Sequence, residues 1–300
     1  MDNKCMNEKM TLSSFAEMDA ARKKIVLVLA GIVAADVLVA VFAYASSDSG
    51  GTIRTAVTDV EVMVTAGTAM GLAAVVVTRQ GLGGLHGRTY AALAIGAAMW
   101  FVGEILWVYY EVGLQIELPS YSPADVFWLL GYGFFGYHLF RMYLYFAKTV
   151  SGAAIIAVGS FVIISLSYLF YQMIVTADFQ TLDGIITFAF RISYPVGDFV
   201  LIMPSILLLI TLRKAKLHFS PWFFISVALL ITAAADTMFS YLSLTGLSEI
   251  EWIANLLYDA ANLCLAGGLY WYNRFVIFDE RRGFSPRPAR DSDQKSIGNV

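Results

Sequence analysis

Long apolar stretches recur along nearly the whole chain and are separated by short polar segments. Apolar runs of at least about 18 residues are typical of membrane-spanning helices, and no period-2 alternation favours strands here. Lipid satisfies no backbone hydrogen bond, so spanning segments must be helices or a closed barrel, and this pattern excludes the barrel. The sequence therefore predicts an all-α, polytopic transmembrane helical bundle of about eight spans, at residues 24–45, 55–78, 89–112, 123–146, 150–175, 194–213, 220–245 and 250–275.

The segments outside these stretches define the rest of the organisation. Residues 1–23 are expected to form a cytoplasmic N-terminal segment, and residues 24–275 a single eight-span transmembrane domain. Residues 279–300 are charged, contain proline and are poor in apolar side chains, which predicts a disordered cytoplasmic tail. The polar start of the chain lacks a small-residue cleavage site, so the first span is interpreted as a retained anchor.

Composition and charge agree with lipid surroundings. The chain is 58% apolar and 14% charged, whereas soluble domains average about 25% charged residues. Lys and Arg gather in the segments on one predicted side, including residues 213–216 and 274–295, while the opposite loops are mainly acidic apart from Arg54 and Arg191. The positive-inside rule then predicts an even number of spans, cytoplasmic termini and a location in the plasma membrane.

The sixth span is the least regular of the eight. The apolar stretch of residues 185–210 is too long for one ordinary span and contains Arg191 and Pro195. Proline near the first helical position is a helix-start signal, so we expect this span to begin near Tyr194. Residues 183–191 would then form a short helix on the outer surface, with Arg191 at the membrane interface.

A layer of carboxylates is the main candidate chemistry. The predicted spans place five acids near one membrane level, and these candidate ligand- or cation-binding residues are Glu104, Asp125, Asp198, Asp236 and Asp259. An acid at the bilayer centre costs about 2.5–3.5 kcal/mol, so such groups face the bundle interior and need partners. Those partners are other acids sharing protons, a bound cation, or nearby donors. The supporting side chains are expected to be Trp100, Trp107, Tyr241, Tyr258 and Asn262.

Glu104 and Asp236 are expected to form the centre of one outward-facing site. Each lies about 16 residues along an outward-running span, hence about 24 Å from the inner surface. Two acids at one level cannot both ionise cheaply unless a cation or a shared proton intervenes. Asp259 is expected beside them.

Structural roles compete with function for several other acids. Asp125 and Asp198 also fit helix-start residues whose carboxylates accept backbone N–H groups. Asp59 and Glu61 are expected to be solvated at the outer end of the second span. Asp36, in the middle of the first span, is open between a structural interhelical hydrogen bond and a functional role.

Several function classes lack the residues that they need. No lysine lies inside a predicted span, which excludes a retinal Schiff base, and His138 is the only histidine there, which excludes bis-histidine haem or an intramembrane zinc hydrolase. A Gly-rich phosphate loop is also missing. Cys5 is predicted in the cytoplasmic N-terminal segment and Cys264 inside the eighth span, so they are not expected to pair. We therefore expect neither an organic cofactor nor a nucleic-acid partner, and the identity of any metal stays open.

An enzyme remains one alternative. Gly197 and Asp198, together with Tyr258 and Asp259, resemble the Gly-Asp and Tyr-Asp motifs of intramembrane aspartyl proteases. The order of the motifs is reversed, and the Pro-Ala-Leu motif of that family is missing. The residues therefore favour a protein without a catalytic residue, while the protease stays open.

A more extensive resemblance covers roughly residues 88–275. Its residues are Trp100, Gly103, Glu104 and Trp107, then Pro123, Ala124, Asp125, Trp128, Leu129 and Tyr132, and finally Tyr194, Pro195, Gly197, Asp198, Asp236 and Tyr241. They resemble the multi-pass N-terminal membrane sensor modules of prokaryotic diguanylate cyclases and histidine kinases. The resemblance implies signal transduction in response to a cation or small-molecule ligand. Because the sequence ends 25 residues after the last predicted span, the output is expected to pass to a separate cytoplasmic signalling protein.

Two further expectations accompany this interpretation. The same acids would also suit a cation- or proton-coupled transporter. The third and fourth spans carry Glu104 and Asp125 at a separation of 21 residues, and the seventh and eighth carry Asp236 and Asp259 at a separation of 23. This similar spacing of acids predicts an internal helix-pair repeat.

Overall fold

The computed structural model describes residues 3–45, 52–116, 121–146, 150–214, 221–247, 250 and 252–277, and their side chains except those of 3–22, 44, 52–55 and 214. These ranges contain eight α-helices: α1 (Asn3–Ala45), α2 (Thr52–Gln80), α3 (Gly84–Val108), α4 (Pro123–Phe146), α5 (Gly152–Val175), α6 (Leu182–Lys214), α7 (Pro221–Thr245) and α8 (Trp252–Trp271). Two π-helical turns, η1 (Tyr109–Gly113) and η3 (Tyr272–Val276), extend α3 and α8. The expectation of an all-helical fold is confirmed for the described ranges.

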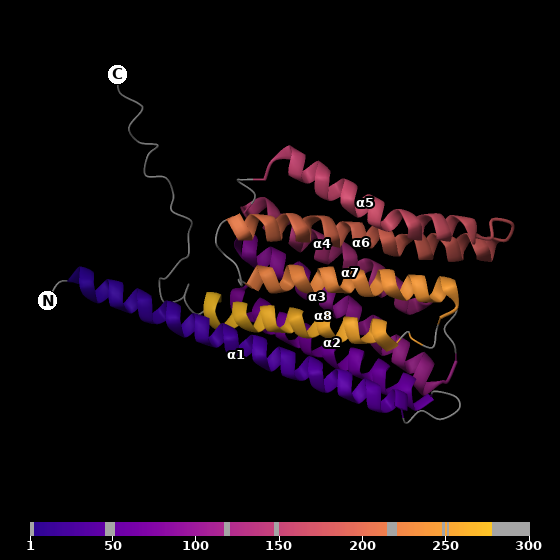
Figure 1. Cartoon of the computed structure of the whole chain (residues 1–300), viewed down its shortest axis with the longest axis horizontal. Coiled ribbons are helices and arrows are strands. Elements are labelled where there is room, and N and C mark those ends of the chain that lie inside the picture. Colours follow the sequence, from indigo (N-terminus) through magenta and orange to yellow (C-terminus); the bar gives the residue numbers. More distant parts are fainter. Residues whose placement is uncertain are drawn as a thin grey trace, which may run out of the picture.

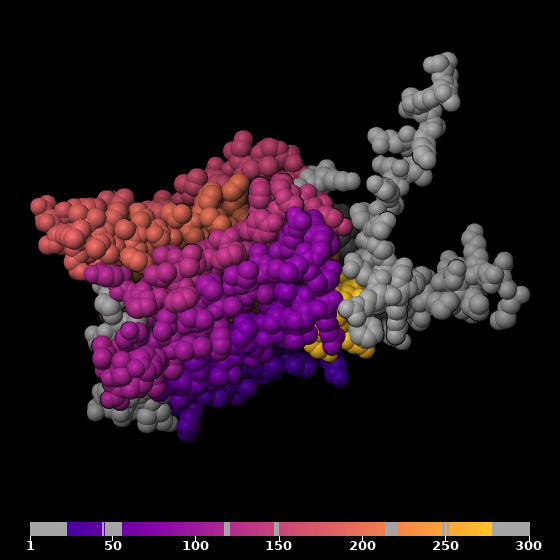
Figure 2. Space-filling view, turned by 180° about the vertical axis from the view of Figure 1, so that it is seen from behind, coloured from indigo at the N-terminus to yellow at the C-terminus, as the bar shows by residue number. Residues whose placement is uncertain are grey.

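The helices run along one common direction and form a bundle (Figure 1), with the start of α1 and the end of α8 at the same end. Helices α3 and α4 pack along each other, as do α7 and α8, and α2 contacts both α3 and α8. Helix α6 joins this group through α4 and α7. Helix α1 contacts α8 and α2 on one margin, while α5 contacts α6 and α7 on the other. Figure 2 shows the reverse face, which α2 to α4 form between these two margins.

Six of the helical segments in the described ranges are long and apolar enough to cross a membrane: Lys23–Ala43, Ala56–Gln80, Gly84–Gly113, Gly152–Val175, Leu182–Arg213 and Pro221–Thr245. Helices α4 and α8 are not among them, yet both pack inside the bundle against these segments. The fold is therefore that of a multi-pass helical membrane protein.

Glycines let the helices that carry the acids approach closely. A Cβ at Gly103 of α3 would lie 2.5 Å from the indole nitrogen of Trp128 in α4. A Cβ at Gly197 of α6 would lie 2.7 Å from the ring of Tyr132, also in α4. Small residues at helix interfaces are typical of membrane proteins, where packing must replace the hydrophobic effect. Trp128 and Tyr132 are thus held in fixed positions by the backbones of the neighbouring helices.

Most helix bounds agree with the sequence prediction within a few residues, and α4 has the predicted bounds. The predicted start of the sixth span near Tyr194 is wrong: α6 is continuous from Leu182 and carries Pro195 and Pro204 inside it. The Thr181 hydroxyl accepts the backbone N–H of Gly184 and so caps the helix at its start. This earlier cap begins the helix, and the buried Pro195 interrupts the backbone hydrogen bonds without ending it.

The first turns of α6 and the end of α5 extend past the neighbouring helices (Figures 1 and 2). Arg191 lies in this region and lines a polar cavity of about 250 Å³ together with Asp178 and Asp183. The separate surface helix at residues 183–191 is therefore not formed. The prediction for the tail at 279–300 falls outside the described residues, and that for Cys5 concerns a side chain that is not described.

Candidate functional site

A pair of buried acids, Asp198 of α6 and Asp236 of α7, lies at the centre of the bundle. They are 1% and 8% exposed, and their carboxyl groups lie on either side of one hydroxyl group, that of Tyr132. The Tyr132 hydroxyl of α4 donates to Asp236 Oδ2 at 2.5 Å and lies 3.4 Å from Asp198 Oδ1. The Tyr258 hydroxyl of α8 donates to Asp236 Oδ1 at 2.6 Å. One network of side chains therefore links α4, α6, α7 and α8.

This geometry has a direct chemical consequence. Two carboxyl groups can hydrogen-bond to each other only when one of them carries a proton, because an ionised carboxylate is an acceptor only. Asp198 and Asp236 therefore form a pair that can hold one proton between them. Tyrosine hydroxyls donate to both oxygens of Asp236, while a proton shared between the two acids stays a prediction.

Glu104 of α3 lies beside this pair and takes a tryptophan partner. The Trp128 indole N–H donates to Glu104 Oε1 at 3.0 Å, and the Trp100 indole N–H donates to the Trp128 carbonyl at 2.9 Å. The Trp107 and Trp128 rings lie 5.6 Å apart. The carboxyl group of Glu104 is close enough to Asp236 to interact with it electrostatically. Trp100 and Trp107 thus contact Trp128, the hydrogen-bond partner of Glu104, and the predicted site of Glu104 and Asp236 stays a prediction.

Asp125 of α4 has two roles. Its Oδ2 accepts the backbone N–H of Ser122 at 2.6 Å and the Ser122 hydroxyl at 2.8 Å, so it stabilises the start of α4 as a first-turn acid should. Its Oδ1 accepts the hydroxyl of Tyr194 in α6. Asp198, in contrast, lies well inside continuous α6, so the helix-start interpretation is wrong for that residue.

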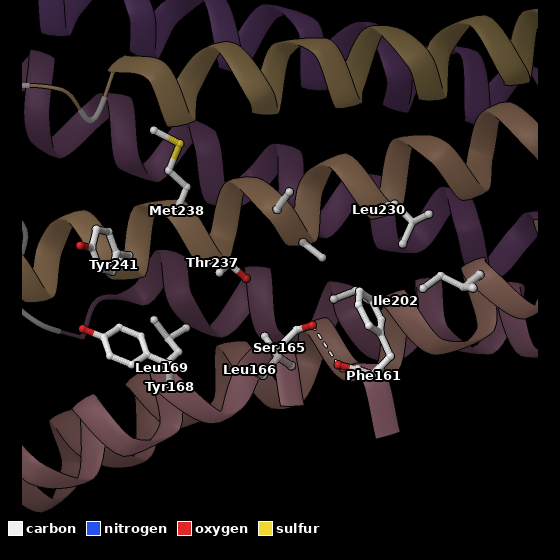
Figure 3. Close-up of a pocket in the computed structure, with 13 residues that line it drawn as sticks. Phe161, Ser165, Leu166, Tyr168, Leu169, Ile202, Leu230, Thr237, Met238 and Tyr241 are labelled. Atoms are coloured by element: carbon white, nitrogen blue, oxygen red, sulfur yellow. Dashed lines mark hydrogen bonds between the residues drawn. The ribbon is translucent and has the colours of Figure 1, made fainter. Parts of the chain in front are cut away.

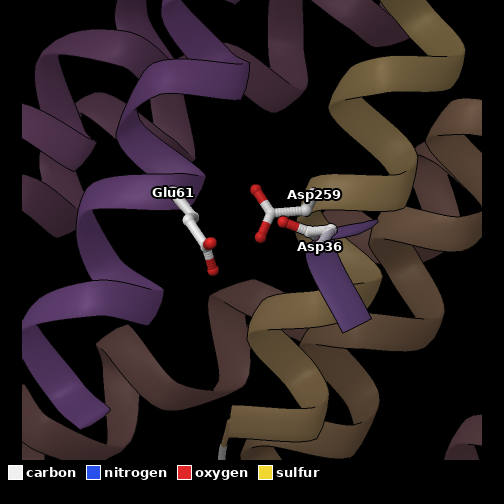
Figure 4. Close-up of side chains that lie close together, drawn as sticks. All are labelled: Asp36, Glu61 and Asp259. Atoms are coloured by element: carbon white, nitrogen blue, oxygen red, sulfur yellow. The ribbon is translucent and has the colours of Figure 1, made fainter. Parts of the chain in front are cut away.

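A second group of acids lies between α1, α2 and α8. One carboxylate oxygen from each of Asp36, Glu61 and Asp259 lies within 4.8 Å of the others (Figure 4). The Thr65 hydroxyl donates to Asp259 Oδ1 at 2.6 Å, and Asn262 donates to Thr65 at 3.3 Å. Carboxylate and hydroxyl oxygens are the ligands that hard cations prefer, so these residues have the chemistry to hold one.

Two candidates from the sequence thus lie away from the acid pair. Asp259 belongs to the acid trio of Asp36, Glu61 and Asp259, because it sits on the face of α8 that packs against α2. Tyr241 is 41% exposed and faces the Tyr168 ring of α5 at 6.4 Å, so it supports none of the acids through these contacts. Asn262 supports the trio through Thr65.

Sequence reasoning missed three important side chains. Tyr132 lies seven residues after Asp125 and therefore two turns further on the same face of α4, a spacing that could have indicated it. Asp36 belongs to the acid trio, and Glu61 does too, although it was expected to be solvated. Asp59 is only 5% exposed and accepts a hydrogen bond from Asn255 at 3.2 Å. The expectation of solvated acids on α2 is wrong because α8 covers this part of the helix.

Polar groups outside the spans organise the outer turns. Asp178 accepts the Thr181 hydroxyl at 2.6 Å and the Gln180 backbone N–H at 2.8 Å, and these bonds lower the pKa of its carboxyl. Tyr121 donates to Asp183 at 2.8 Å, and this bond raises the pKa of the tyrosine hydroxyl. The α5–α6 turn is thus tied to the segment before α4.

The pairing of acids also bears on the protease resemblance. That resemblance would bring Asp198 and Asp259 together, but Asp198 takes Asp236 as its carboxyl partner, and Asp259 lies with Asp36 and Glu61. Comparison with protein-family models, with curated proteins and with solved structures found no match to this chain. The arrangement of the acids is therefore the basis for any assignment of function.

Proposed function

We propose that this protein is a non-enzymatic membrane sensor module whose buried acids respond to protons or to a cation from the outer side. The observation that carries the proposal is the Asp198–Asp236 pair, bonded to Tyr132 of α4 and Tyr258 of α8. Four helices meet in one network that contains a single exchangeable proton. A change in that proton alters the hydrogen bonds between helices, which is how a local charge event becomes a change in helix arrangement.

Glu104 adds a third acid beside the Asp198–Asp236 pair. The indole of Trp128, which packs against Gly103, donates to Glu104, and the Glu104 carboxyl interacts electrostatically with Asp236. A cation that bound between Glu104 and Asp236 would offset the cost of two ionised acids in one buried region. The sensor response would then arise from α3 and α7 together.

The sides of the membrane follow from the sequence. With eight spans, cytoplasmic termini and the positive-inside rule, the acid pair lies toward the outer half of the bilayer. The output then passes at the opposite end to a separate cytoplasmic signalling protein, as the resemblance to diguanylate cyclase and histidine kinase modules implies. The proposal includes an internal repeat of two helix pairs, α3–α4 and α7–α8. In the first pair Trp128 donates a hydrogen bond to Glu104, and in the second pair Tyr258 donates one to Asp236.

Tryptophan fluorescence of the full chain in phosphatidylcholine vesicles tests the proposal. Trp128 bonds to Glu104, so its emission should change as external pH or external cation concentration is varied. Glu104→Gln and Asp236→Asn keep hydrogen-bonding groups of similar shape and should abolish this change. Asp183→Asn is the matched control, because that acid lies at the outer turn and should leave the response intact. An unaltered response in both acid variants would refute the proposal.

A cation- or proton-coupled transporter is the second candidate, and the acid trio of Asp36, Glu61 and Asp259 favours it. A transporter needs sites that cations or protons occupy in passing, and intramembrane acids commonly mark such paths. Flux of protons or cations into the same vesicles separates the two functions. Flux that Asp259→Asn abolishes would support transport, whereas a fluorescence response without flux would support the sensor.

A further inference from the structure

A lateral cavity of about 500 Å³ lies between α5, α6 and α7 (Figure 3). Helix α5 contributes Ser165 and Tyr168, α6 contributes Ile202, and α7 contributes Ala234 and Thr237. All three helices belong to the segments that are long and apolar enough to cross a membrane. The cavity is on the α5 margin of the bundle, away from the acid trio on the α1 margin. Its surroundings in a bilayer are therefore hydrocarbon.

The shape of the cavity fits a chain better than a compact ligand. Its lining follows one face of α7 from Leu230 to Tyr241, which at 1.5 Å per residue is about 16 Å. The hydrocarbon core of a bilayer is about 30 Å thick, so one leaflet offers tails of about this length. The volume falls in the usual range for small-molecule sites, about 300–1,000 Å³.

The lining chemistry also favours a hydrocarbon chain. Leu230, Ile202 and Leu169 supply apolar walls, and the small Ala234 leaves the groove open along α7. The Ser165 hydroxyl donates to the carbonyl of Phe161 at 2.9 Å, so it is satisfied within its own helix (Figure 3). Few polar groups remain to orient a polar ligand. An apolar wall that opens toward lipid is matched by an acyl tail.

One lining residue connects the cavity to the acid pair. Thr237 lies next to Asp236 in α7 and interacts through its hydroxyl with Asp198. Ile202 lies one turn after Asp198 on nearly the same face of α6, so the groove and Asp198 share a segment of this helix. A chain in the groove would therefore touch the residue that bonds to the acid pair.

We propose that this groove binds one acyl chain of a bilayer phospholipid as a specific site. The bound chain holds α5 apart from α7 and fixes the position of Thr237. Through Thr237 it sets the surroundings of the Asp198–Asp236 pair, a step that rests on the sensor function proposed above. Binding of the chain itself does not depend on that function.

Photo-crosslinking tests the site in the full chain reconstituted in phosphatidylcholine vesicles. A fraction of the lipid carries a diazirine in one acyl chain, and mass spectrometry locates the adducts. Adducts at Thr237 and Met238 should exceed those at Ile164, which is 71% exposed on α5 and meets only bulk lipid. Ala234→Phe should remove the cavity adducts and keep those at Ile164. Ala157→Phe, at an exposed alanine of α5 outside the cavity, should change neither.

Other results would overturn the proposal. These are cavity adducts no more frequent than at Ile164, adducts formed only by a diazirine-bearing free fatty acid, or crosslinks between two copies of the chain in place of lipid adducts. Ser165→Leu fills the groove from the opposite wall and serves if Ala234→Phe does not fold.

The fluorescence response of Trp128 tests the link to the acids. It should shift along the pH axis in Ala234→Phe and not in Ala157→Phe. Asp236→Asn should retain the lipid adducts, so a lost response with intact adducts separates failure of the sensor from failure of the lipid site. An unshifted response in Ala234→Phe, with the adducts gone, would overturn the coupling.

Discussion

The acid pair and the acid trio bury the same kind of group in different ways. Asp198 and Asp236 lie among four helices and receive hydroxyl donors from Tyr132 and Tyr258. In the trio, Thr65 donates to Asp259, whereas Asp36 Oδ2 and Glu61 Oε2 are buried atoms without a hydrogen-bond partner among the described residues. In the pair, Asp198 Oδ2 is such an atom as well, but two tyrosine hydroxyls stabilise Asp236. Two of the three acids of the trio therefore depend on protons or a cation to offset their charges.

The helices that carry the pair are also more deeply buried than the helix that carries Asp36. Half of the most apolar window of α6 and of α7 is buried, but only 6% of that of α1 is. Asp36 of α1 therefore lies on a helix held by few contacts, and repulsion within the trio acts against those contacts. Removing a polar group should thus destabilise the region of the pair and stabilise the region of the trio. The opposite signs of these two changes in stability can be measured.

Gly197→Ala should have the largest effect, on the region of the pair. The added Cβ would lie 2.7 Å from the Tyr132 ring, and a buried ring in a packed interface moves only at a cost. Overpacking typically costs about 1–3 kcal/mol, and displaced Tyr132 would also lose its bond to Asp236. Thermal unfolding in detergent micelles measures the loss. Gly133→Ala is the control, because a Cβ there meets nothing within 4 Å and alanine favours a helix by about 1 kcal/mol.

Tyr132→Phe removes the shared donor and leaves the ring in place. A buried acceptor without its partner costs about 1–3 kcal/mol, so the unfolding temperature should fall. In an Asp236→Asn background the penalty should shrink, because the amide can act as a donor to Asp198. Tyr90→Phe is a matched control, since Tyr90 is 1% exposed and its hydroxyl has no partner in the described region. Equal losses at the two tyrosines would contradict the role of the pair.

Asp36→Asn should act in the opposite direction and stabilise the protein. It removes one of three acids whose oxygens lie within 4.8 Å, and a like-charge contact at this range costs about 1 kcal/mol or more. The unfolding temperature at neutral pH, measured in a chelator, should therefore rise, and Glu61→Gln should produce a similar rise. A fall in both variants would indicate instead that the trio is held together by a bound cation.

Asp178 is an exposed acid that can be compared with the buried ones. Its substitution should have the smallest effect on stability. Its pKa in the folded protein is lowered by hydrogen bonds from Thr181 and Gln180. Its contribution to stability is therefore present above its ordinary value of 3.8 and is lost as pH falls through the lower folded value. Hydrogen exchange at the Gln180 amide should speed up in that range. Asp178→Asn should remove this pH dependence without altering the response of Trp128.

Sequence alone predicted the helices well, because hydrophobic length and turn residues are local signals. Pro123 and the first-turn Asp125 marked the start of α4 at the correct residue. For α6 the proline signal at Pro195 led to a wrong start, because the cap at Thr181, which the sequence analysis did not consider, begins the helix earlier. A proline in a helix that is supported by neighbours need not end it.

Counting residues along each span predicted that Glu104 and Asp236 lie at one level, but it could not show which neighbouring helix each acid faces. The two carboxyl groups lie close enough to interact electrostatically, while their common site stays a prediction. The same count could not show that Asp259 points toward α2, because that depends on how α8 is rotated against its neighbours. The partnership of Asp36 and Glu61 with Asp259 needed the contact of α1 with α8, which leaves no local signal in the sequence.

The two prolines of α6 weaken the backbone hydrogen bonding of the helix segments next to Asp198. Pro195 and Pro204 lie on either side of Asp198 within one helix, and each removes a backbone hydrogen bond to the residue four positions earlier. The segment between them therefore bends with fewer bonds to break than any uninterrupted helix would. In the proposed sensor, a proton that enters or leaves the pair would act on this flexible segment and change the direction of α6.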